Sequence, residues 1–576
     1  MLLLIWFYST LFVSESLSAI NQYNSLNIRI FVIFFVITLS LGFQRYFFFP
    51  KILKINVYFF GVFFYTGSAI IAGLFIAPNN YDSMTYHFPR YLHWLSNQNL
   101  DYFYTSNNRQ NIMPILPDIL FAQLHAIFFS DRFLFFPVWL SIVVTSYYIY
   151  KISMLINRSR NIAYLSGFIA LIIPSQLAFM SSSQTDPIST VLVTILFYYA
   201  VLFNSKQEKS LIYLMIFMIP LFLTAKTTGL ILSIPIYLFI LVKYNRLIIK
   251  NLGKYFGFLI LVILPSLPYV YRFWIFGTDK ARGVFVSEPS LSGLVVNLWR
   301  ISLTNLQSPL SIVNNLIEQF FYWGATNLRL EPNPIGYSSY GEFFLTSSLH
   351  GDSVGNPLHF IYLIIAIIVL RKSKTNRALI YLILTQFVLI GAFIGWQPWI
   401  NRFTSTILVL GSILTGLWLG ARSKTLRTLL VGVLVAYSLF WVFFNPTRAI
   451  ANPKPLILIG QSLGVKSEYL NKIRYDLSLP RESQYFSARP EIEESYIQAG
   501  ELIKEIGISK LYLKIGGDDF EYPIWALTGF SVLIDHFEES NIYEFEEGNV
   551  YLLCTQSCEK YGLELVFMDK YLSLWK

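Results

Sequence analysis

A polar run between residues 77 and 90 places an acid, a histidine and an arginine within nine residues of one another. It reads Ala77-Pro-Asn-Asn-Tyr-Asp-Ser-Met-Thr-Tyr-His-Phe-Pro-Arg90 and follows directly on an apolar segment. Ionisable groups at the end of a membrane helix cost free energy if they enter lipid, so this position indicates a site at the membrane surface. A carboxylate beside aromatic side chains can act as a general base if it stays ionised near neutral pH. We therefore take Asp82 as the candidate catalytic residue.

Several neighbours of Asp82 are candidates for contacting a substrate. Tyr81 and Tyr86 flank the acid, and Arg109 follows later in the same loop. If the run is helical, His87 and Arg90 lie on one face, because positions three or four apart are neighbours on a helix. This set could shape a binding site around the carboxylate.

A helix cap is the competing interpretation of the acid. Asn79, Asn80 or Asp82 could each close the first turn of a helix at the membrane surface. A second acid, Asp186, precedes Pro187, and there a cap is the more economical role because proline is favoured in a first helical turn. A divalent metal held by Asp82 and Asp186 is left open, since neither loop carries the paired acids of a strong metal motif.

The composition excludes an ordinary soluble protein. The 576 residues are 55% hydrophobic, 18% aromatic and only 13% charged, whereas soluble proteins have about a quarter of charged residues. The net charge of +10 does not indicate nucleic acid as a partner, because the basic residues stand in small groups between apolar segments. We predict a polytopic α-helical membrane protein.

About thirteen segments approach the length needed to cross a membrane. They occur near residues 2–19, 28–43, 56–76, 133–150, 162–180, 188–203, 211–225, 228–242, 255–275, 358–370, 378–395, 403–420 and 428–444. Alternate connections are basic: Arg45, Lys51 and Lys54; Lys151, Arg158 and Arg160; Lys206 and Lys209; Lys243, Arg246, Lys250 and Lys254; Arg371, Lys372, Lys374 and Arg377; Arg422, Lys424 and Arg427. The positive-inside rule makes these connections and the N-terminus cytoplasmic, and the C-terminus extracytoplasmic.

This topology puts the polar parts of the chain outside. The outer loops are residues 77–132 and 276–357, and residues 114–129 within the first are expected to be a helix at the outer interface rather than a span. We divide the chain into N-terminal transmembrane helices (1–55), a transmembrane catalytic domain (56–445) and an extracytoplasmic domain (446–576). The residues Glu331, Glu342, His350 and Asp352 of the second long loop could recognise an acceptor, and none of them stands out.

The C-terminal part has the composition of a soluble domain. An amphipathic stretch covers residues 491–506, and short apolar runs at 510–515, 531–534 and 550–553 alternate with turns such as Gly516-Gly517-Asp518. This pattern predicts a small α/β domain. The two cysteines, Cys554 and Cys558, would pair there if the domain is extracytoplasmic, and so small a loop would add little stability.

Two cations on the predicted outer side, Lys226 and Arg402, stand apart from the basic cytoplasmic connections. Lys226 lies between two short apolar segments, where a charge is costly without a partner, although its long stem could also carry it to the interface. Arg402 follows Trp396 and Trp399 and breaks the positive-inside trend. Arginine suits phosphate because of its bidentate fork.

The first outer loop resembles that of the GT-C superfamily of membrane glycosyltransferases. The similarity rests on Asn80-Tyr81-Asp82-Ser83 after a transmembrane helix, then Arg90, His93-Trp94 and Arg109-Gln110, and on Tyr522-Pro523-Ile524-Trp525 in the C-terminal part. The similarity extends over residues 56–420. The superfamily includes aminoarabinose transferases, protein O-mannosyltransferases and related bacterial enzymes. The similarity implies a GT-C-like catalytic domain in which Asp82 matches the catalytic acid of the first loop.

The resemblance implies an inverting glycosyltransferase of the bacterial cytoplasmic membrane. Such an enzyme takes a sugar from a polyprenyl-phosphate carrier and transfers it to a hydroxyl of a glycan, lipid or protein acceptor on the outer face. Lys226 and Arg402 would lie near the carrier phosphate, and Tyr81, Tyr86, His87, Arg90 and Arg109 would shape the sugar and acceptor site. Two alternatives stay open: a flippase or transporter of lipid-linked glycans, which would carry repeats and acids near the bilayer midplane, and a glycan polymerase or ligase that uses the loop 276–357.

Overall fold

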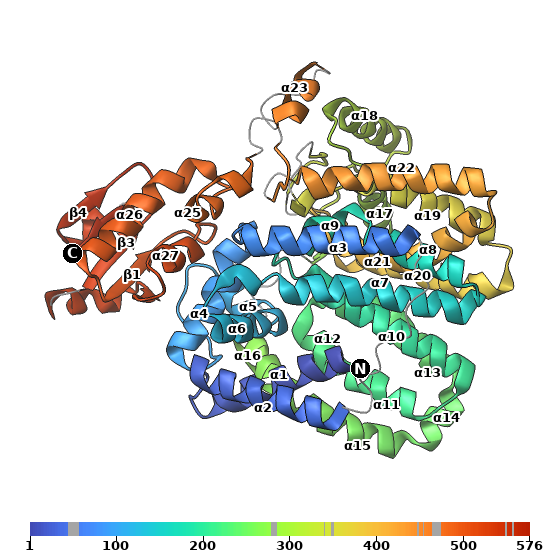
Figure 1. Ribbon diagram of the computed structural model, residues 1–576, viewed down its shortest axis with the longest axis horizontal. Helices are drawn as coiled ribbons and strands as arrows, with labels where there is room; N and C mark the ends of the chain where they lie inside the picture. The colour runs from blue at the N-terminus through green and yellow to red at the C-terminus, as the bar shows by residue number, and fades with distance from the viewer. Residues whose placement is uncertain are drawn as a thin grey trace.

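The fold is described from a computed structural model of the chain. It describes residues 1–43, 57–277, 285–338, 340–346, 351–445, 448–452, 454–462, 474–547, 550–555 and 558–576. The basic group Arg45, Lys51 and Lys54 and the loop residue His350 lie outside these ranges. Figure 1 shows a large helical body, with a smaller α/β part at its left end formed by the C-terminal residues.

The helical body begins with the elements that form and surround residues 77–132, the loop predicted to be the first outer one and called the first outer loop below. They are α1 (Leu2–Ala19), α2 (Ser25–Phe43), α3 (Val57–Phe75), the π-helical turn η1 (Ser83–His87), α4 (Phe88–Asn97), α5 (Arg109–Ile112), α6 (Leu116–Phe128), α7 (Phe136–Asn157), α8 (Arg160–Leu171), α9 (Pro174–Met180) and α10 (Asp186–Lys206). The later helices are α11 (Ser210–Phe217), α12 (Ile219–Ala225), α13 (Thr227–Lys243), α14 (Asn245–Lys250), α15 (Leu252–Ile263), α16 (Leu267–Phe276), α17 (Leu291–Asn305), α18 (Ser311–Asn327), α19 (Pro357–Leu370), α20 (Lys374–Phe393), α21 (Asn401–Gly420), α22 (Lys424–Phe443) and α23 (Lys454–Ser462).

The helices establish a multi-pass membrane protein, but not the expected count of spans. Within the described ranges, nine helices are long and apolar enough to cross a membrane, or ten if one bent pair is a single span. The four other predicted spans are three shorter apolar helices, at Ser25–Thr38, Ser210–Ala225 and Thr227–Lys243, and the bent pair α8 and α9, which meet at 65°. The bend has a local cause, since Pro174 begins α9 and forces Ile173 into an extended conformation.

The centre of the body is built from α7, α8, α10 and α21. In α21, 89% of the most apolar stretch is buried, which is the highest share among the candidate spans in the described ranges. Small residues let the backbones approach: a Cβ on Gly416 of α21 would lie 2.1 Å from Oγ of Ser166 in α8, and one on Gly167 would lie 2.9 Å from the Ser146 carbonyl oxygen in α7. Close contact at small residues is how helices associate where no water drives them together. This packing fixes the position of α21, the helix that carries Arg402 in its first turn.

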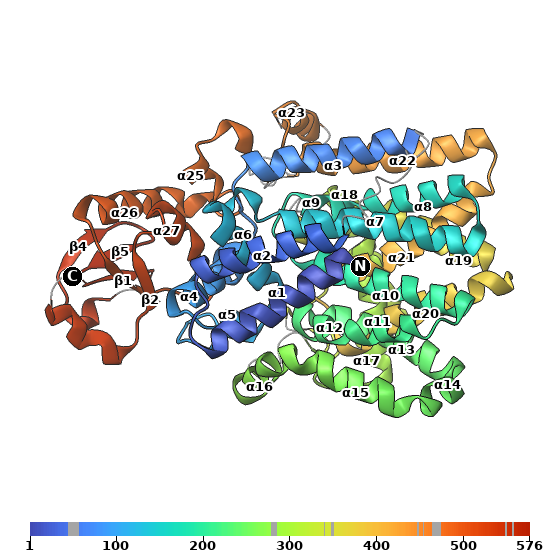
Figure 2. The same cartoon turned by 60° about the horizontal axis from the view of Figure 1, so that its bottom comes forward.

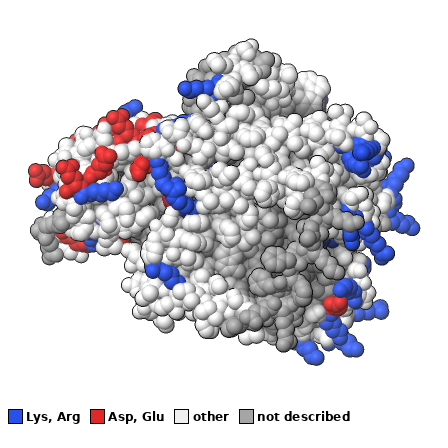
Figure 3. Space-filling view, viewed as in Figure 1, with Lys and Arg blue, Asp and Glu red and all other residues white. Residues whose placement is uncertain are grey.

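Basic and acidic side chains lie mostly at opposite ends of the molecule. In Figure 3 most of the visible lysines and arginines gather at the end opposite the C-terminal part, while the visible acids gather over that part. This distribution is what the positive-inside rule requires if the basic end is cytoplasmic.

The first outer loop folds into the body instead of lying on its surface. Helix α6, expected at the outer interface, is buried along nearly its whole length and packs against α1, α2 and α4. Pro117 lies in the first turn of the helix, and the polar residues of α6 are satisfied internally, with Gln123 accepting hydrogen bonds from Trp6 at 2.8 Å and Thr10 at 3.2 Å. The loop is therefore anchored in the helical body.

The C-terminal part is a small α/β domain, as its pattern predicts. Helices α25 (Arg481–Gln484), α26 (Glu493–Ile506) and α27 (Tyr522–Leu527) accompany a sheet of β1 (Lys510–Lys514), β2 (Leu533–His536), β3 (Val550–Cys554), β4 (Leu565–Met568) and β5 (Ser573–Trp575). The strand order is β2-β1-β3-β5-β4, with β1 parallel to both neighbours and Leu511 opposite Ile534 and Tyr551. Strands β3, β5 and β4 are antiparallel, and β4 and β5 were not expected from the sequence. Figure 2 shows α26 and α27 on one side of this sheet.

A buried carboxylate ties this domain to the first outer loop. Asp131, directly after α6, accepts hydrogen bonds from the hydroxyls of Tyr485 at 2.8 Å and Tyr522 at 3.1 Å, and pairs with Arg481. A buried carboxylate needs such partners, because an unpaired charge in an apolar environment is very costly. The domain is thus docked through polar contacts that a displaced domain would lose.

Cys554 and Cys558 form a disulfide. The bond closes a loop between residues only four apart, and short loops give small entropic stabilisation. Its contribution is therefore local to the end of β3.

A pH dependence of stability follows from Asp476. Its carboxyl is buried, and burial raises its pKa to about 7, against the hydrogen bond from Ser487 and the charge of Arg448. Because the folded pKa exceeds the unfolded value of about 3.9, the stabilising proton is fully present below pH about 4 and is lost as pH rises through about 7. We expect Asp476→Asn to remove a stability difference on the order of a few kcal/mol between pH 5 and 8.

Thermal unfolding of the purified protein at pH 5 and pH 8 measures this effect. The half-buried Asp535 in β2 offers the control Asp535→Asn, which should leave the difference between the two pH values unchanged. Equal pH dependence in wild type and Asp476→Asn would contradict the prediction.

Candidate active site

The backbone around Asp82 leaves its carboxylate free of capping duty. Asn80 closes the turn, because its Oδ1 accepts a hydrogen bond from the Ser83 amide at 2.9 Å, while the Asp82 side chain makes no capping bond. The following η1 is a π-helical turn, a rare form that is frequent at functional sites. Of the two interpretations that the sequence leaves open for Asp82, the cap belongs to Asn80.

Arg402 holds three carboxylates that come from three separate parts of the chain. It is the second residue of α21, and its Nη2 lies 2.8 Å from Asp82 Oδ2. Its Nε lies 3.1 Å from Asp186 Oδ2, and its Nη1 lies 3.5 Å from Asp352 Oδ1. The planar guanidinium has five N–H donors, so one side chain can serve all three acids.

Lys226 and Gln184 complete this group. Lys226 is a single extended residue, with φ −171° and ψ 137°, between α12 and α13, and its Nζ lies 2.7 Å from Asp186 Oδ1. Gln184 donates from Nε2 to Asp82 Oδ2 at 3.1 Å and to Asp352 Oδ1 at 2.6 Å. We call these six residues the ionic cluster: Asp82, Gln184, Asp186, Lys226, Asp352 and Arg402.

Some side chains of the ionic cluster are partly exposed to solvent, and others are buried. The side chains of Lys226, Asp82 and Asp352 are 18%, 14% and 14% exposed, while those of Arg402 and Asp186 are 7% and 3% exposed. Burial opposes ionisation of Asp82, but Arg402, with His87 and Lys226 farther off, lowers the pKa of that carboxyl well below its usual range. Asp82 is therefore ionised and accessible, and as long as Arg402 holds it, it is a weak base.

The ionic cluster does not suit a divalent metal at Asp82 and Asp186. The Oδ2 atoms of both acids point at the guanidinium of Arg402, and the other oxygen of Asp186 is paired with Lys226. A cation that shares both carboxylates is thus already present as arginine. Within the described part of the chain these acids belong to no group of three His, Cys, Asp or Glu ligand atoms, and we derive no metal-dependent step here.

Tyr81, Tyr86 and Arg109 lie beside the ionic cluster at the edge of the C-terminal domain. Tyr81 donates from its hydroxyl to the Asp518 carbonyl oxygen at 2.9 Å. Arg109 donates from Nη2 to the Gly517 carbonyl oxygen at 2.7 Å and lies 5.1 Å from the centre of the Tyr86 ring. The turn at residues 516–518 of the C-terminal domain therefore contacts the residues beside Asp82.

His87 and Arg90 form a separate buried group around Asp118. His87 Nδ1 lies 2.6 Å and Arg90 Nη1 lies 2.9 Å from the two oxygens of this carboxylate, and Arg90 also donates to three main-chain carbonyls at residues 111–114. Arg90 is 1% exposed. Among the described residues, no hydrogen bond or ion pair joins Arg90 to Asp82. Together, His87 and Arg90 tie the end of η1 and the start of α4 to Asp118 in α6.

Sequence analysis predicts other roles for Asp186 and Asp352 than the ones they have in the structure, and it predicts no role in a site for Asp118 and Gln184. Asp186 was expected to cap its helix, but its side chain makes no cap and pairs with Lys226 and Arg402 instead. Asp352 was one of several polar loop residues, and Asp118 lay in a helix expected at the interface. Only Gln184, two residues before Asp186, carried a local signal, as a polar residue in the same short loop.

The fold and the ionic cluster define a class: a multi-pass membrane protein with a buried ionic site between its first loop, α10 and α21. Residues 113–271, just over a quarter of the chain, match the family model of dolichyl-phosphate-mannose-protein mannosyltransferases. This match, which includes Asp186 and Lys226, confirms the resemblance to GT-C membrane glycosyltransferases. No curated protein sequence matches the chain.

The solved structures that resemble the chain include two of ArnT and one of AglB. ArnT from Cupriavidus metallidurans in the apo state is 11% identical, with a TM-score of 0.48, over 90% of this chain and 98% of that one. The same protein bound to undecaprenyl phosphate is 9% identical, with a TM-score of 0.49 and the same coverage. The archaeal oligosaccharyltransferase AglB from Archaeoglobus fulgidus, in complex with an inhibitory peptide and a dolichol-phosphate, is 13% identical, with a TM-score of 0.37, over 86% of this chain and 70% of that one. At these scores none carries an argument about the site.

Proposed function

We propose that this protein transfers a sugar from a polyprenyl-phosphate carrier to a hydroxyl of a glycan, lipid or protein acceptor on the outer face of a bacterial cytoplasmic membrane. The observation that carries the proposal is the meeting of Asp82, Lys226 and Arg402 in one partly accessible cluster. The family whose model matches residues 113–271 is described by a lipid-phosphate-linked sugar donor, which supports the same donor class here.

Asp82 is proposed as the general base. It takes the proton of the acceptor hydroxyl while the oxygen forms a bond to the anomeric carbon, and the bond from that carbon to the phosphate oxygen breaks. The electron pair of the broken bond leaves with the carrier phosphate. A single displacement of this kind inverts the configuration at the anomeric carbon.

Binding of the donor is proposed to activate the base. A phosphodiester carries one negative charge, and at Arg402 it would have to replace one of three carboxylates. Asp186 should stay, because it also has Lys226 and is almost fully buried. Asp352 is already the most distant of the three, at 3.5 Å, so displacing it would free little of the guanidinium, and we propose that Asp82 is the acid that yields. Losing the arginine would raise the pKa of Asp82 toward its ordinary value, so the base gains strength only when the donor is present.

The test measures donor class directly. Detergent-purified protein is incubated with radiolabelled sugars on polyprenyl phosphate, in parallel with the same sugars on nucleotide diphosphates, together with envelope lipids, glycans and peptides as acceptors. We expect label to move to an acceptor from the polyprenyl donors alone. Use of the nucleotide donors would contradict the proposal and favour a glycosyltransferase that depends on nucleotide sugars. Movement of the carrier across the membrane of sealed vesicles without sugar transfer would contradict it and favour a flippase.

A further inference from the structure

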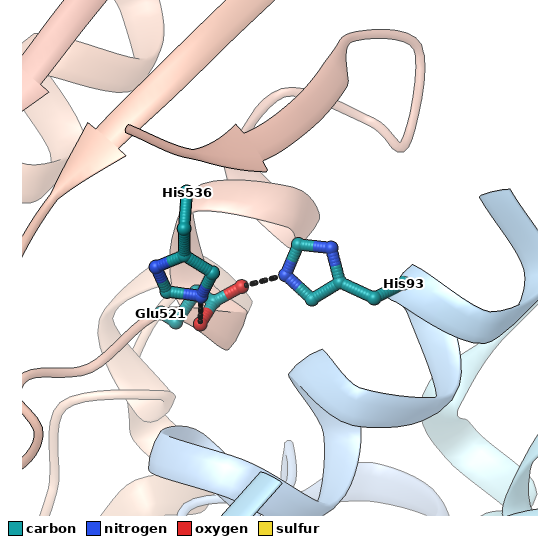
Figure 4. A group of neighbouring side chains, drawn as sticks. All are labelled: His93, Glu521 and His536. Atoms are coloured by element: carbon teal, nitrogen blue, oxygen red, sulfur yellow. Dashed lines mark hydrogen bonds and ion pairs between the residues drawn. The ribbon is translucent and has the colours of Figure 1, made fainter. Parts of the chain in front are cut away.

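A second buried cluster lies where the C-terminal domain meets the first outer loop. It consists of His93 in α4, Glu521 directly before α27 and His536 at the end of β2 (Figure 4). The residues are 1%, 0% and 6% exposed. None of them takes part in the ionic cluster.

In Figure 4 the carboxylate of Glu521 lies between the two imidazole rings, and each ring turns one nitrogen toward it. His93 Nε2 lies 2.7 Å from Glu521 Oε1, and His536 Nε2 lies 3.2 Å from Glu521 Oε2, as Figure 4 shows. One ligand atom from each residue lies within 4.8 Å of the others. Two ligands of a tetrahedral zinc ion stand roughly 3.3 Å apart, so the His536 pair already has that spacing and the His93 pair would open by roughly half an ångström.

His536 is left without hydrogen bonds although its ring is buried. Nδ1 has no hydrogen-bond partner within the described chain, and Nε2 has only the ion pair with Glu521 Oε2 at 3.2 Å. A buried polar atom without a hydrogen bond needs a structural explanation, and a bound water or ion in front of it is one. A cation in front of Nε2 would satisfy the ring through its lone pair.

The surroundings of Glu521 resemble the outer shell of a metal site. Gln110 donates from Nε2 to Glu521 Oε2 at 2.6 Å, and Trp525 donates from Nε1 to Oε1 at 3.3 Å. Hydrogen bonds of this kind orient a ligating carboxylate and are part of how proteins tune metal sites. The carboxylate is therefore fixed with its two oxygens facing the histidines.

We propose that His93, Glu521 and His536 bind a zinc-class divalent cation, with water as the fourth ligand. Two imidazoles and one carboxylate suit zinc better than magnesium or calcium, which prefer oxygen ligands. The ligands come from the first outer loop and from two elements of the C-terminal domain, so the ion joins the two parts. Glu521 also donates its main-chain amide to the Met84 carbonyl oxygen at 3.0 Å, two residues after Asp82, and the ion thus steadies the loop that carries this acid.

Metal analysis of the whole protein tests the proposal. Protein purified in detergent without a polyhistidine tag is incubated with zinc, desalted and measured by mass spectrometry of the elements. We expect one zinc per chain in the wild type and in a control variant, His125→Gln, which removes another buried histidine of the first loop. His93→Gln and His536→Gln should lose most of it, and cobalt in place of zinc should give the visible absorption of a tetrahedral site.

Thermal unfolding of the wild type with zinc and with chelator is a second test, and it does not require that the variants fold. Zinc should raise the melting temperature of the wild type relative to protein in chelator, because a ligand that binds only the folded state stabilises it. A wild type that retains no zinc and melts at the same temperature in both buffers would overturn the site, as would equal zinc in wild type and His536→Gln. These measurements use no sugar donor, so failure of the proposed transfer reaction would leave them valid.

Discussion

Asp82→Asn is expected to reduce sugar transfer by about 10²- to 10⁴-fold, which is the contribution of a positioned general base. Asparagine has nearly the shape of aspartate but cannot accept the acceptor's proton. Arg402 keeps Asp186 and Asp352 as partners in this variant, so the protein should still insert and fold. Transfer of label from the polyprenyl donor, followed over time, measures the effect, and thermal unfolding shows that the loss is not one of stability.

Two further variants make this test specific. Asp101→Asn changes an acid of the same loop whose side chain is 66% exposed, and it should keep wild-type activity. Asp82→Glu retains the carboxylate but moves it by one methylene, so it should fall between the wild type and Asp82→Asn. Asp82→Asn with transfer close to the wild-type rate would remove Asp82 from the reaction.

Arg402→Gln is expected to cost about 3–5 kcal/mol of stability, because breaking a buried pair leaves uncompensated charges. Here the loss would leave Asp82, Asp186 and Asp352 facing Lys226 as the remaining cation of the ionic cluster. Transfer should also fall to background, since the proposed phosphate contact disappears with the guanidinium.

Arg402→Lys separates charge from geometry. Lysine keeps the charge but has no planar fork that could reach three carboxylates, so stability and transfer should both lie between those of the wild type and Arg402→Gln. Arg422, just beyond the other end of α21 and half-buried, provides the control Arg422→Lys, which should change neither. A melting temperature of Arg402→Gln equal to that of the wild type would show that the three acids do not depend on this arginine.

Local patterns determined the elements of this protein and the candidates within them. Long apolar segments with few charges can only be stable as helices in lipid, so the membrane class and most spans follow from composition alone. Short apolar runs separated by turns likewise predicted β1, β2 and β3. Asp82 and Lys226 stood out for a physical reason as well, because a charge next to an apolar segment is costly without a role.

Tertiary structure alone decided which of these residues meet. Arg402 and Asp82 are separated by 320 positions, and Glu521 and His93 by 428, so no local periodicity links them. Asp186 shows the difference most directly: beside Pro187 it has the pattern of a helix cap, and only the packing of α10 against α13 and α21 turns it toward Lys226 and Arg402. A charge chooses its partner by distance and desolvation in the folded state, and neither quantity exists along the unfolded chain.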